Sequence, residues 1–172
     1  MIRGVPPTVW ALRSAVVLGP VVAVSAAAPQ GYSPSAFVVT VVLLTALGWA
    51  FAPDHLLGGV SVLLVLAWWA TVVGDALPFA SVVAAGGLLL SHTAATVLGY
   101  GPPRTRIAPR LLGTWAVRAA AVWVVALAIW VVADAYSGHA TPASFWLLGL
   151  AAALVGAVVA ALRAPVRDPW GP

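Results

Sequence analysis

Apolar residues fill six long runs of this chain, and short polar or proline-containing breaks separate the runs. Each run has roughly the 17 to 25 residues that a helix needs to cross a bilayer. In lipid a segment must satisfy its own backbone hydrogen bonds, so each run is expected to be a helix. The predicted spans are residues 8–28, 35–52, 55–73, 79–100, 111–133 and 143–162. The sequence therefore predicts an all-α integral membrane protein, a single transmembrane domain over residues 1–172 built as a bundle of six helices.

The least distinct break lies between the second and third runs, where only Pro53-Asp54 separates them. Proline ends a helix and a following aspartate can cap the next one, so we expect two helices here. A single helix over both runs would exceed the thickness of any bilayer. The expected arrangement is a hairpin whose third span opens with Asp54-His55.

The first run allows two interpretations. Arg3 and Arg13 precede a short apolar stretch that ends in small residues, a pattern typical of a cleaved signal peptide. Cleavage would leave five spans and would not change their orientations. We favour an uncleaved helix, because a multi-pass protein normally keeps its first span and Pro29 spoils the last cleavage position.

All eight basic residues are arginines, and half of them lie in or just beyond the loop 101–110. These four are Arg104, Arg106, Arg110 and Arg118. With a cytoplasmic N-terminus, six spans place every arginine on the inner side, as the positive-inside rule requires. Both termini, the loop 101–110 and the tail 163–172 are therefore predicted to be cytoplasmic.

Tryptophans mark the two membrane boundaries independently of the arginines, because indole rings favour the headgroup level. The expected inner set is Trp10, Trp49 and Trp115, and the outer set is Trp68, Trp69, Trp130 and Trp146. Both signals predict the same topology.

The composition excludes several classes of protein. With 63% hydrophobic and 7% charged residues and a mean hydropathy of +1.07, the chain is far from the balance of a soluble domain. It has no cysteine, which excludes disulfides, thiolate catalysis and cysteine metal sites. Arginines beside anionic headgroups at the inner face explain the net charge of +4, so no nucleic-acid partner is expected. The absence of lysine and glutamate in an alanine-rich chain indicates a GC-rich genome and a bacterial plasma membrane.

A weak internal repeat accompanies the spans. Trp10-Ala-Leu-Arg13 matches Trp115-Ala-Val-Arg118, and each is followed by a span and then by a hydroxyl residue, a proline and a phenylalanine. One interpretation is a series of hairpins over residues 8–52, 55–100 and 111–162, the middle one being the faintest. The other is that alanine-rich helices match each other by chance, and both stay open.

Small residues also recur every four positions in the first run, at Ala15, Gly19, Ala23 and Ala27, which allows close helix contact.

The sequence contains no catalytic or phosphate-binding motif, so we predict no enzyme, no cofactor and no metal. His92 stands out because it lies well inside the fourth run, where an ionisable group often has a function. Small residues share its face at helical spacing, so we expect it in the bundle interior, bonded to a hydroxyl such as Thr96 or Ser91. Arg118 either joins His92 and Thr96 in an intramembrane polar site or, as we favour, extends back to the inner headgroups.

Two groups of polar residues are expected at the membrane surfaces. On the inner side, Asp54 and His55 face the level of the arginine loop, either as a helix cap or as a cytoplasmic contact together with Arg104, Arg106 and Arg110. On the outer side, Asp75, Asp134, Tyr136 and His139 have no spacing that is diagnostic of a metal site.

Two functions fit these observations. The favoured one is a non-enzymatic subunit or scaffold of a larger membrane complex, which contacts a membrane protein partner or further copies of itself. The alternative is a small oligomeric transporter or permease with a site near His92. The two differ in whether His92 is packed among small residues or lines a cavity with further polar groups.

Overall fold

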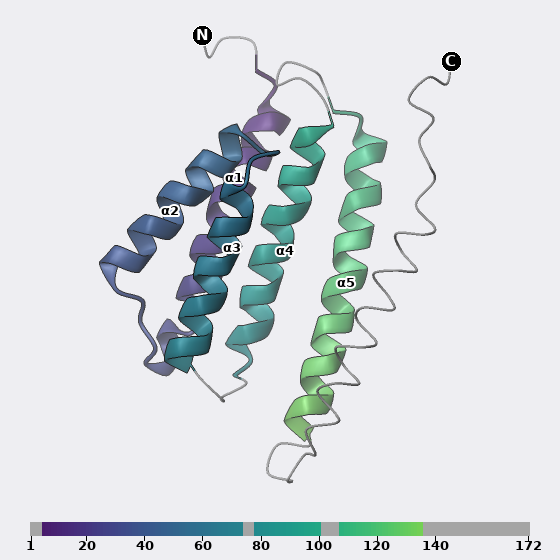
Figure 1. Cartoon of the computed structure of the whole chain (residues 1–172). Helices are drawn as coiled ribbons and strands as arrows, with labels where there is room; N and C mark the ends of the chain where they lie inside the picture. The colour runs from purple at the N-terminus through teal and green to yellow at the C-terminus, as the bar shows by residue number, and fades with distance from the viewer. Residues whose placement is uncertain (1–4, 74–77, 101–106, 136–172) are drawn as a thin grey trace. The chain divides into compact units, whose positions relative to one another are not determined.

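The computed structural model describes residues 5–73, 78–100 and 107–135. The chain divides into two compact units, residues 1–134 and 135–172, and the sixth predicted span and the tail lie outside the described residues. The described residues are all-helical and contain no strand, as predicted. Figure 1 shows the elements of the first unit. They are α1 (Pro7–Ser25), the 3₁₀ turn η1 (Ala28–Gln30), α2 (Ala36–Phe51), α3 (Leu57–Trp68), the π-helical segment η2 (Trp69–Val73), α4 (Ala80–Gly99) and α5 (Pro109–Ala135).

Among the described residues, three helical segments are long and apolar enough to cross a membrane: Pro7–Gln30, Ala80–Gly99 and Pro109–Ala135. The other two, Ala36–Phe51 and Leu57–Val73, are apolar but shorter. At 1.5 Å per residue they extend roughly 25 Å, against about 30 Å of hydrocarbon in a typical bilayer. Each of the first five predicted runs therefore contains a helix, while the count of six spans stays a prediction.

The turn between α2 and α3 differs from the expected one. We expected Asp54 to cap the third span, but α3 begins at Leu57 with Leu56 at its N-cap and no side-chain cap. The turn is instead closed by the backbone, because the amide of His55 donates to the carbonyl of Ala52 at 3.0 Å. Proline does end α2 as predicted, but the aspartate beside it is left exposed rather than used as a cap.

Among the described helices, α1 and α4 make the most extensive contact. They run antiparallel, since Ala15 of α1 meets Ser91 of α4 and Gly19 meets Gly87. Gly19 and Gly87 lie backbone to backbone, and a Cβ on Gly87 would sit 2.6 Å from the Gly19 carbonyl oxygen. The hydroxyl of Ser91 donates to the carbonyl of Gly87 (2.9 Å) and reaches that of Ala15 (3.4 Å). Ala23 follows on the same face of α1. The small-residue stripe predicted in the first run is confirmed, and it serves a contact within the chain.

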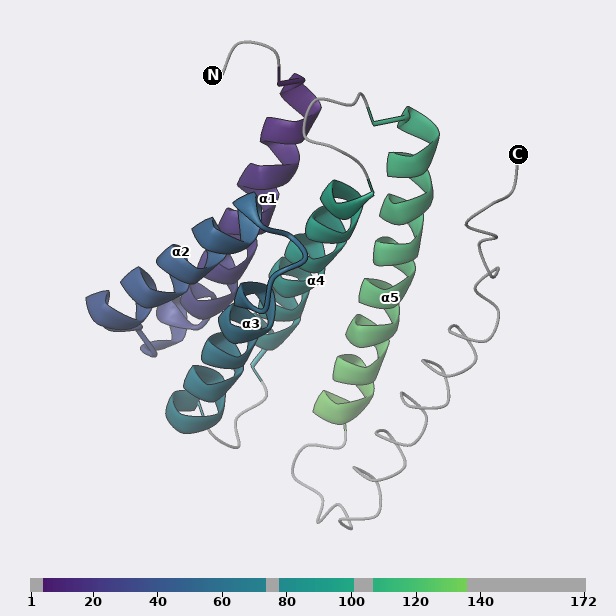
Figure 2. The same cartoon turned by 45° about the horizontal axis from the view of Figure 1, so that its top comes forward.

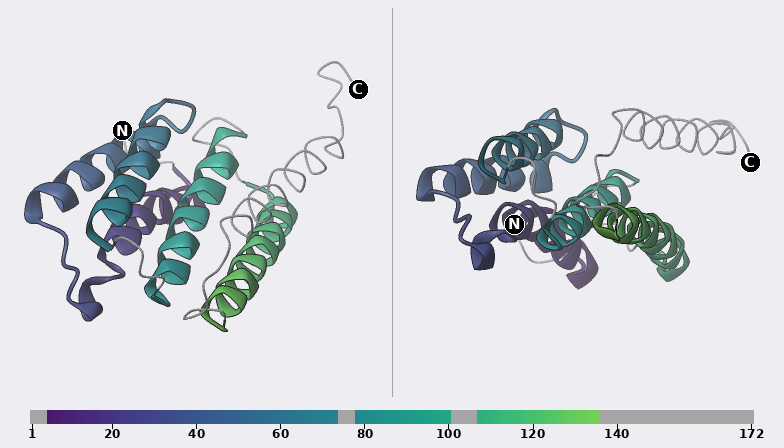
Figure 3. Two further views of the ribbon diagram at one scale, coloured as in Figure 1. Left: turned by 60° about the horizontal axis from the view of Figure 1, so that its bottom comes forward. Right: turned by 90° about the horizontal axis from the view of Figure 1, so that it is seen from below.

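The hairpin of α2 and α3 packs against α1 on one side of the unit, and α5 lies beyond α4 (Figures 2 and 3). One core cluster joins Val16 to Trp49 and Ala94, and the other joins Ala23 to Val65 and Ala84. The π-helical segment adds a polar link, since the Trp69 indole N–H donates to the carbonyl of Ala23 at 2.9 Å.

A row of aromatic side chains connects α5 to α4. The Trp123 indole N–H donates to the Val82 carbonyl at 3.1 Å, beside Gly86, where a Cβ would lie 2.7 Å from that nitrogen. Near one end of α5, Trp130 meets Phe79 edge to face with centroids 5.3 Å apart, and near the other, Trp115 contacts Tyr100 at 6.0 Å. No residue of α5 is buried within the described chain. Side chains rather than close backbone packing therefore hold this helix.

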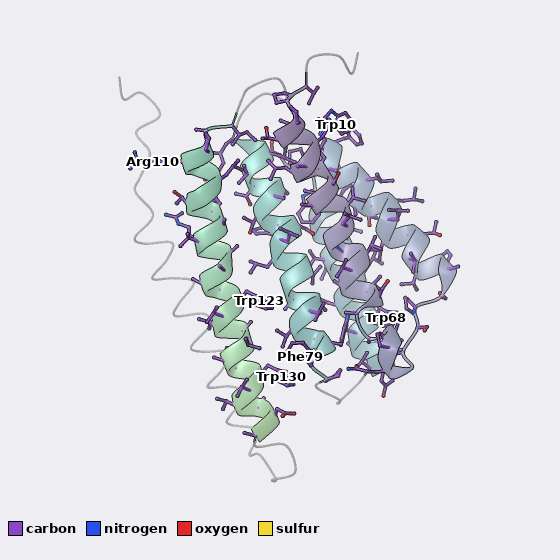
Figure 4. All side chains as sticks on the ribbon, turned by 180° about the vertical axis from the view of Figure 1, so that it is seen from behind. Trp10, Trp68, Phe79, Arg110, Trp123 and Trp130 are labelled. Carbon is purple, nitrogen blue, oxygen red and sulfur yellow. The ribbon has the colours of Figure 1, made fainter. Side chains whose placement is uncertain are left out.

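The labelled side chains in Figure 4 show how the aromatic and basic residues are distributed along the helices. Trp10 and Arg110 lie toward the end where α1 and α5 begin, and Trp68, Phe79 and Trp130 lie toward the opposite end. This order agrees with the two boundary levels expected from the sequence.

Candidate functional site

A cavity of about 680 Å³ lies between the α2–α3 turn, the first half of α3 and the second half of α4. Its wall is mostly apolar, with a few polar groups gathered from segments that are distant in sequence. The lining residues are Trp49, Pro53, Asp54, His55, Gly58, Gly59, Val62, Leu63, His92, Ala95, Thr96, Gly99 and Tyr100.

Glycines bring the walls of this cavity close together. Gly58 is buried against the Trp49 ring, and a Cβ there would lie 2.5 Å from the indole nitrogen and 2.9 Å from Cδ2. Trp49 is only 4% exposed, so it forms a fixed part of the wall. A Cβ on Gly99 would lie 3.1 Å from the carboxylate of Asp54, which shows that the α2–α3 turn docks on the last turn of α4. By contrast, no atom lies within 4 Å of the position that a Cβ on Gly59 would take.

His92 does not have the interior environment expected from the sequence. It is exposed within the described chain and lines the cavity. The two hydroxyls expected to bond its ring are used elsewhere, since Thr96 donates to the backbone carbonyl of His92 (2.8 Å) and Ser91 to those of Gly87 and Ala15. The buried face of α4 runs through Ser91 and Ala94, because α1 approaches most closely there. His92 follows Ser91, so its side chain is rotated from that of Ser91 by about 100° around the helix axis. This rotation places His92 beside the face that meets α1, where it lines the cavity.

The structure brings together polar residues that the sequence placed in two separate candidate sites. Asp54 and His55, expected as a cytoplasmic contact, line the same cavity as His92 and Thr96. Asp54, His55 and His92 are all exposed, and Thr96 is half-buried. Among the described residues, no three histidine or carboxylate groups are placed to hold a metal ion. The cavity therefore offers separate hydrogen-bonding groups on an apolar wall.

Arg118 is not part of this site, although the sequence suggested that it could group with His92 and Thr96. It is exposed on α5, with its guanidinium carbon 5.4 Å from the centroid of Trp115, three residues earlier. Arg13 has the same relation to Trp10, at 5.3 Å. Both copies of the Trp-Ala-x-Arg motif thus form the same local pair, while the superposition of whole hairpins stays a prediction.

Of the arginine loop, Arg110 opens α5 and is exposed, whereas Arg104 and Arg106 lie outside the described residues. On the other side of the predicted membrane, Asp75, Tyr136 and His139 also lie outside them.

The sequence analysis did not identify Trp49, Gly59 and Tyr100 as residues of the site. Adjacent glycines at 58 and 59 within an apolar run were a usable signal, since glycine in a membrane helix often marks close approach. Tyr100 is 41% exposed, lines the cavity and contacts Trp115 on α5.

In comparisons with known proteins, no family model matches this sequence, and no curated protein or solved structure matches it either. Function must therefore be inferred from the residues and their geometry.

Proposed function

We propose that this chain is a multi-pass protein of a bacterial plasma membrane, of the transporter or permease class, that binds a small amphiphilic solute in the cavity between α3 and α4. The observation that supports the proposal is the position of His92, which lines a cavity with Asp54, His55 and Thr96 instead of packing among small residues. A volume of about 680 Å³ is within the usual range for small-molecule sites, as is an apolar wall with few polar groups.

The proposed topology has six spans with both termini in the cytoplasm. The helices α1 and α5 both run antiparallel to α4, so they begin at the same end of the unit. Arg13, Arg110 and Arg118 all lie in the first half of one of these two helices. Common placement of the arginines supports a cytoplasmic assignment for that end. The cavity, which lies between the α2–α3 turn and the end of α4, would then open toward the cytoplasm.

The side chains predict an amphiphilic solute rather than an inorganic ion. The wall supplies a carboxylate from Asp54, imidazoles from His55 and His92, and the aromatic faces of Trp49 and Tyr100. Such groups bind a ligand that has both a polar end and an apolar body.

Two glycines allow a matched test. Gly59 lines the cavity and Gly113 lies on α5, and neither has any atom within 4 Å of the position that a Cβ would take. We expect Gly59→Leu to fill the cavity and Gly113→Leu to leave it open. The purified protein is screened by thermal shift against a panel of small amines, carboxylic acids and sugars, and the stabilising solutes are then tested for uptake into proteoliposomes. Solutes should stabilise the wild type and Gly113→Leu but not Gly59→Leu.

The same screen can contradict the proposal in two ways. If Gly59→Leu responds to every solute as the wild type does, then the cavity is not the binding site. If no panel member stabilises the wild type, then the chain does not bind this class of solute.

A second candidate is the non-enzymatic subunit or scaffold, and the observation that favours it is the surface of α5. This helix has no buried residue within the described chain, and large apolar side chains such as Val117 (70%) and Ile129 (59%) are exposed along it. A membrane protein partner or a second copy of the chain would cover such a face, as would lipid. If the scaffold proposal holds, Val125→Ala with Ile129→Ala reduces co-purification of a partner, and the matched change Leu44→Ala with Leu47→Ala on α2 does not. If the two double substitutions change co-purification equally, then lipid rather than a protein partner covers the exposed face of α5.

A further inference from the structure

Arg13 is held between two aromatic rings at the end of the unit where α1 begins and α2 ends. Its guanidinium carbon lies 5.3 Å from the centroid of Trp10 and 4.8 Å from that of Phe51. Its Nε atom is buried and has no hydrogen-bond partner among the described residues. The two rings interact with the guanidinium through cation–π attraction, which leaves its N–H donors as the groups still to be satisfied.

The buried Nε–H is costly in this position, because it has no acceptor among the described residues. A donor that is shielded from water costs free energy unless an acceptor meets it, and the cost is greater for a charged group. The rings of Trp10 and Phe51, which together form a clamp around the guanidinium, are partly exposed, at 37% and 61%. The edge of this clamp is therefore accessible from outside the bundle. An acceptor that approaches from the membrane side can therefore reach the terminal Nη groups of Arg13, which are not buried as Nε is.

Arg118 repeats this arrangement in a simpler form. It lies over Trp115 at 5.4 Å, and Trp115 in turn contacts Tyr100 at 6.0 Å. Arg118 is exposed, and within the described part of the chain a single ring, that of Trp115, lies against its guanidinium; Arg13 is half-buried between two rings. The same motif therefore produces one clamped and one open arginine, both in the first half of helices that begin at the same end.

We propose that Arg13, clamped by Trp10 and Phe51, binds the phosphate group of an anionic lipid headgroup in the inner leaflet. This site is independent of the solute cavity, but it rests on the proposed membrane topology. A planar guanidinium can bind two phosphate oxygens at once, and the rings hold its plane in a fixed orientation for that contact. A lysine in the same place would keep the charge but would lose both the planar fork and the stacking.

The test measures how phosphatidylglycerol shifts the thermal stability of the full chain in detergent micelles, with phosphatidylcholine and inorganic phosphate as separate arms. Phosphatidylglycerol should stabilise the wild type in a saturable way, and the other two should not. We expect Arg13→Lys to weaken the apparent affinity roughly tenfold, since a bidentate contact becomes a single point charge. Arg110→Gln is the matched control, because it removes one exposed arginine; it should lower the response only by the salt-sensitive amount that a single surface charge contributes, and the response should remain saturable.

Phe51→Leu provides a second variant, which keeps the arginine and removes one ring of the clamp. It should also weaken the response to phosphatidylglycerol while the protein still elutes as a folded species. If Arg13→Lys and Phe51→Leu both respond as the wild type does, then the site is refuted. If inorganic phosphate stabilises the protein as much as phosphatidylglycerol does, then the site binds a free anion and not a lipid headgroup. If phosphatidylcholine does so, then the site does not select lipids by the negative charge of their headgroup. Failure of the chain to fractionate with membranes would refute the membrane location on which this site rests.

Discussion

Replacing Gly87 with alanine tests the contact between α1 and α4 most directly. A Cβ at this position would lie 2.6 Å from the carbonyl oxygen of Gly19 and 3.5 Å from the amide nitrogen of Ala23. The near atom belongs to helix backbone, which cannot rotate away as a side chain would. Ordinary contact distances are about 3.5 Å, so the two helices must move apart by roughly 1 Å.

Two opposing terms decide the sign of the change in unfolding free energy. Alanine is favoured over glycine inside a helix by about 1 kcal/mol. Forcing an extra methyl group into a close contact costs about 1 to 3 kcal/mol. The separation would also lengthen the contact from the Ser91 hydroxyl to the Ala15 carbonyl, which is already 3.4 Å. We therefore expect Gly87→Ala to destabilise the protein by up to about 2 kcal/mol, because the steric term exceeds the propensity term.

Gly113→Ala is the matched control, since no atom lies within 4 Å of the Cβ that it would add. The helix-propensity term is common to both variants, so the difference between them measures the steric term of about 1 to 3 kcal/mol. Gly113→Ala should stabilise the protein by about 1 kcal/mol, since it gains helix propensity and meets no steric contact. The measurement is reversible unfolding in mixed micelles with increasing dodecyl sulfate, followed by circular dichroism. Equal free energies of unfolding for Gly87→Ala and Gly113→Ala would refute the close contact between α1 and α4.

Three further predictions concern α5, the topology and the arginine loop. Trp123→Phe removes the 3.1 Å hydrogen bond to the Val82 carbonyl and should lower the free energy of unfolding by about 0.6 to 1.7 kcal/mol in the same assay. The control Trp115→Phe should lower it by less. Equal losses of stability in the two variants would contradict a role for that bond. Single cysteines at Gln30 and His55 should label from opposite sides of the membrane, with no background because the chain has no cysteine, and labelling of both from outside would contradict the topology. The loop variant replaces three arginines with glutamine, namely Arg104, Arg106 and Arg110. It should weaken orientation or partner recovery in a salt-sensitive way, since each arginine contributes about 1 kcal/mol near an anionic surface, and an unchanged outcome would remove the loop from the functional account.

Hydrophobic run length predicted the first five helices because it reports a property of each segment alone. It was less informative at Asp54, where the backbone closes the turn and the carboxylate docks beside Gly99. That contact joins residues 45 positions apart in the chain, and no local pattern contains it. The position of the α2–α3 turn was therefore predicted correctly, but the prediction that Asp54 caps α3 was wrong.

The environment of His92 could not be predicted because α4 carries small residues on several faces. Helical spacing shows which residues share a face, but it does not show which face another helix will meet. In the structure the meeting point is set by Gly87 and Ser91, whose small size allows the backbone of α1 to approach most closely. His92 is next to Ser91 in sequence, and so it lies on the neighbouring face.

The packing of α4 explains how one helix can serve both the stability of the bundle and the proposed binding site. Its Gly87 and Ser91 face is locked to α1 by backbone contact, which fixes the position and rotation of the helix. The adjacent face then presents His92 and Thr96 to the cavity from a rigid support, as a binding site requires. The opposite wall is the α2–α3 turn, which has no side-chain cap and meets α4 where Asp54 approaches Gly99. Because this contact joins the turn to the same helix that carries His92 and Thr96, both walls of the cavity are positioned by α4.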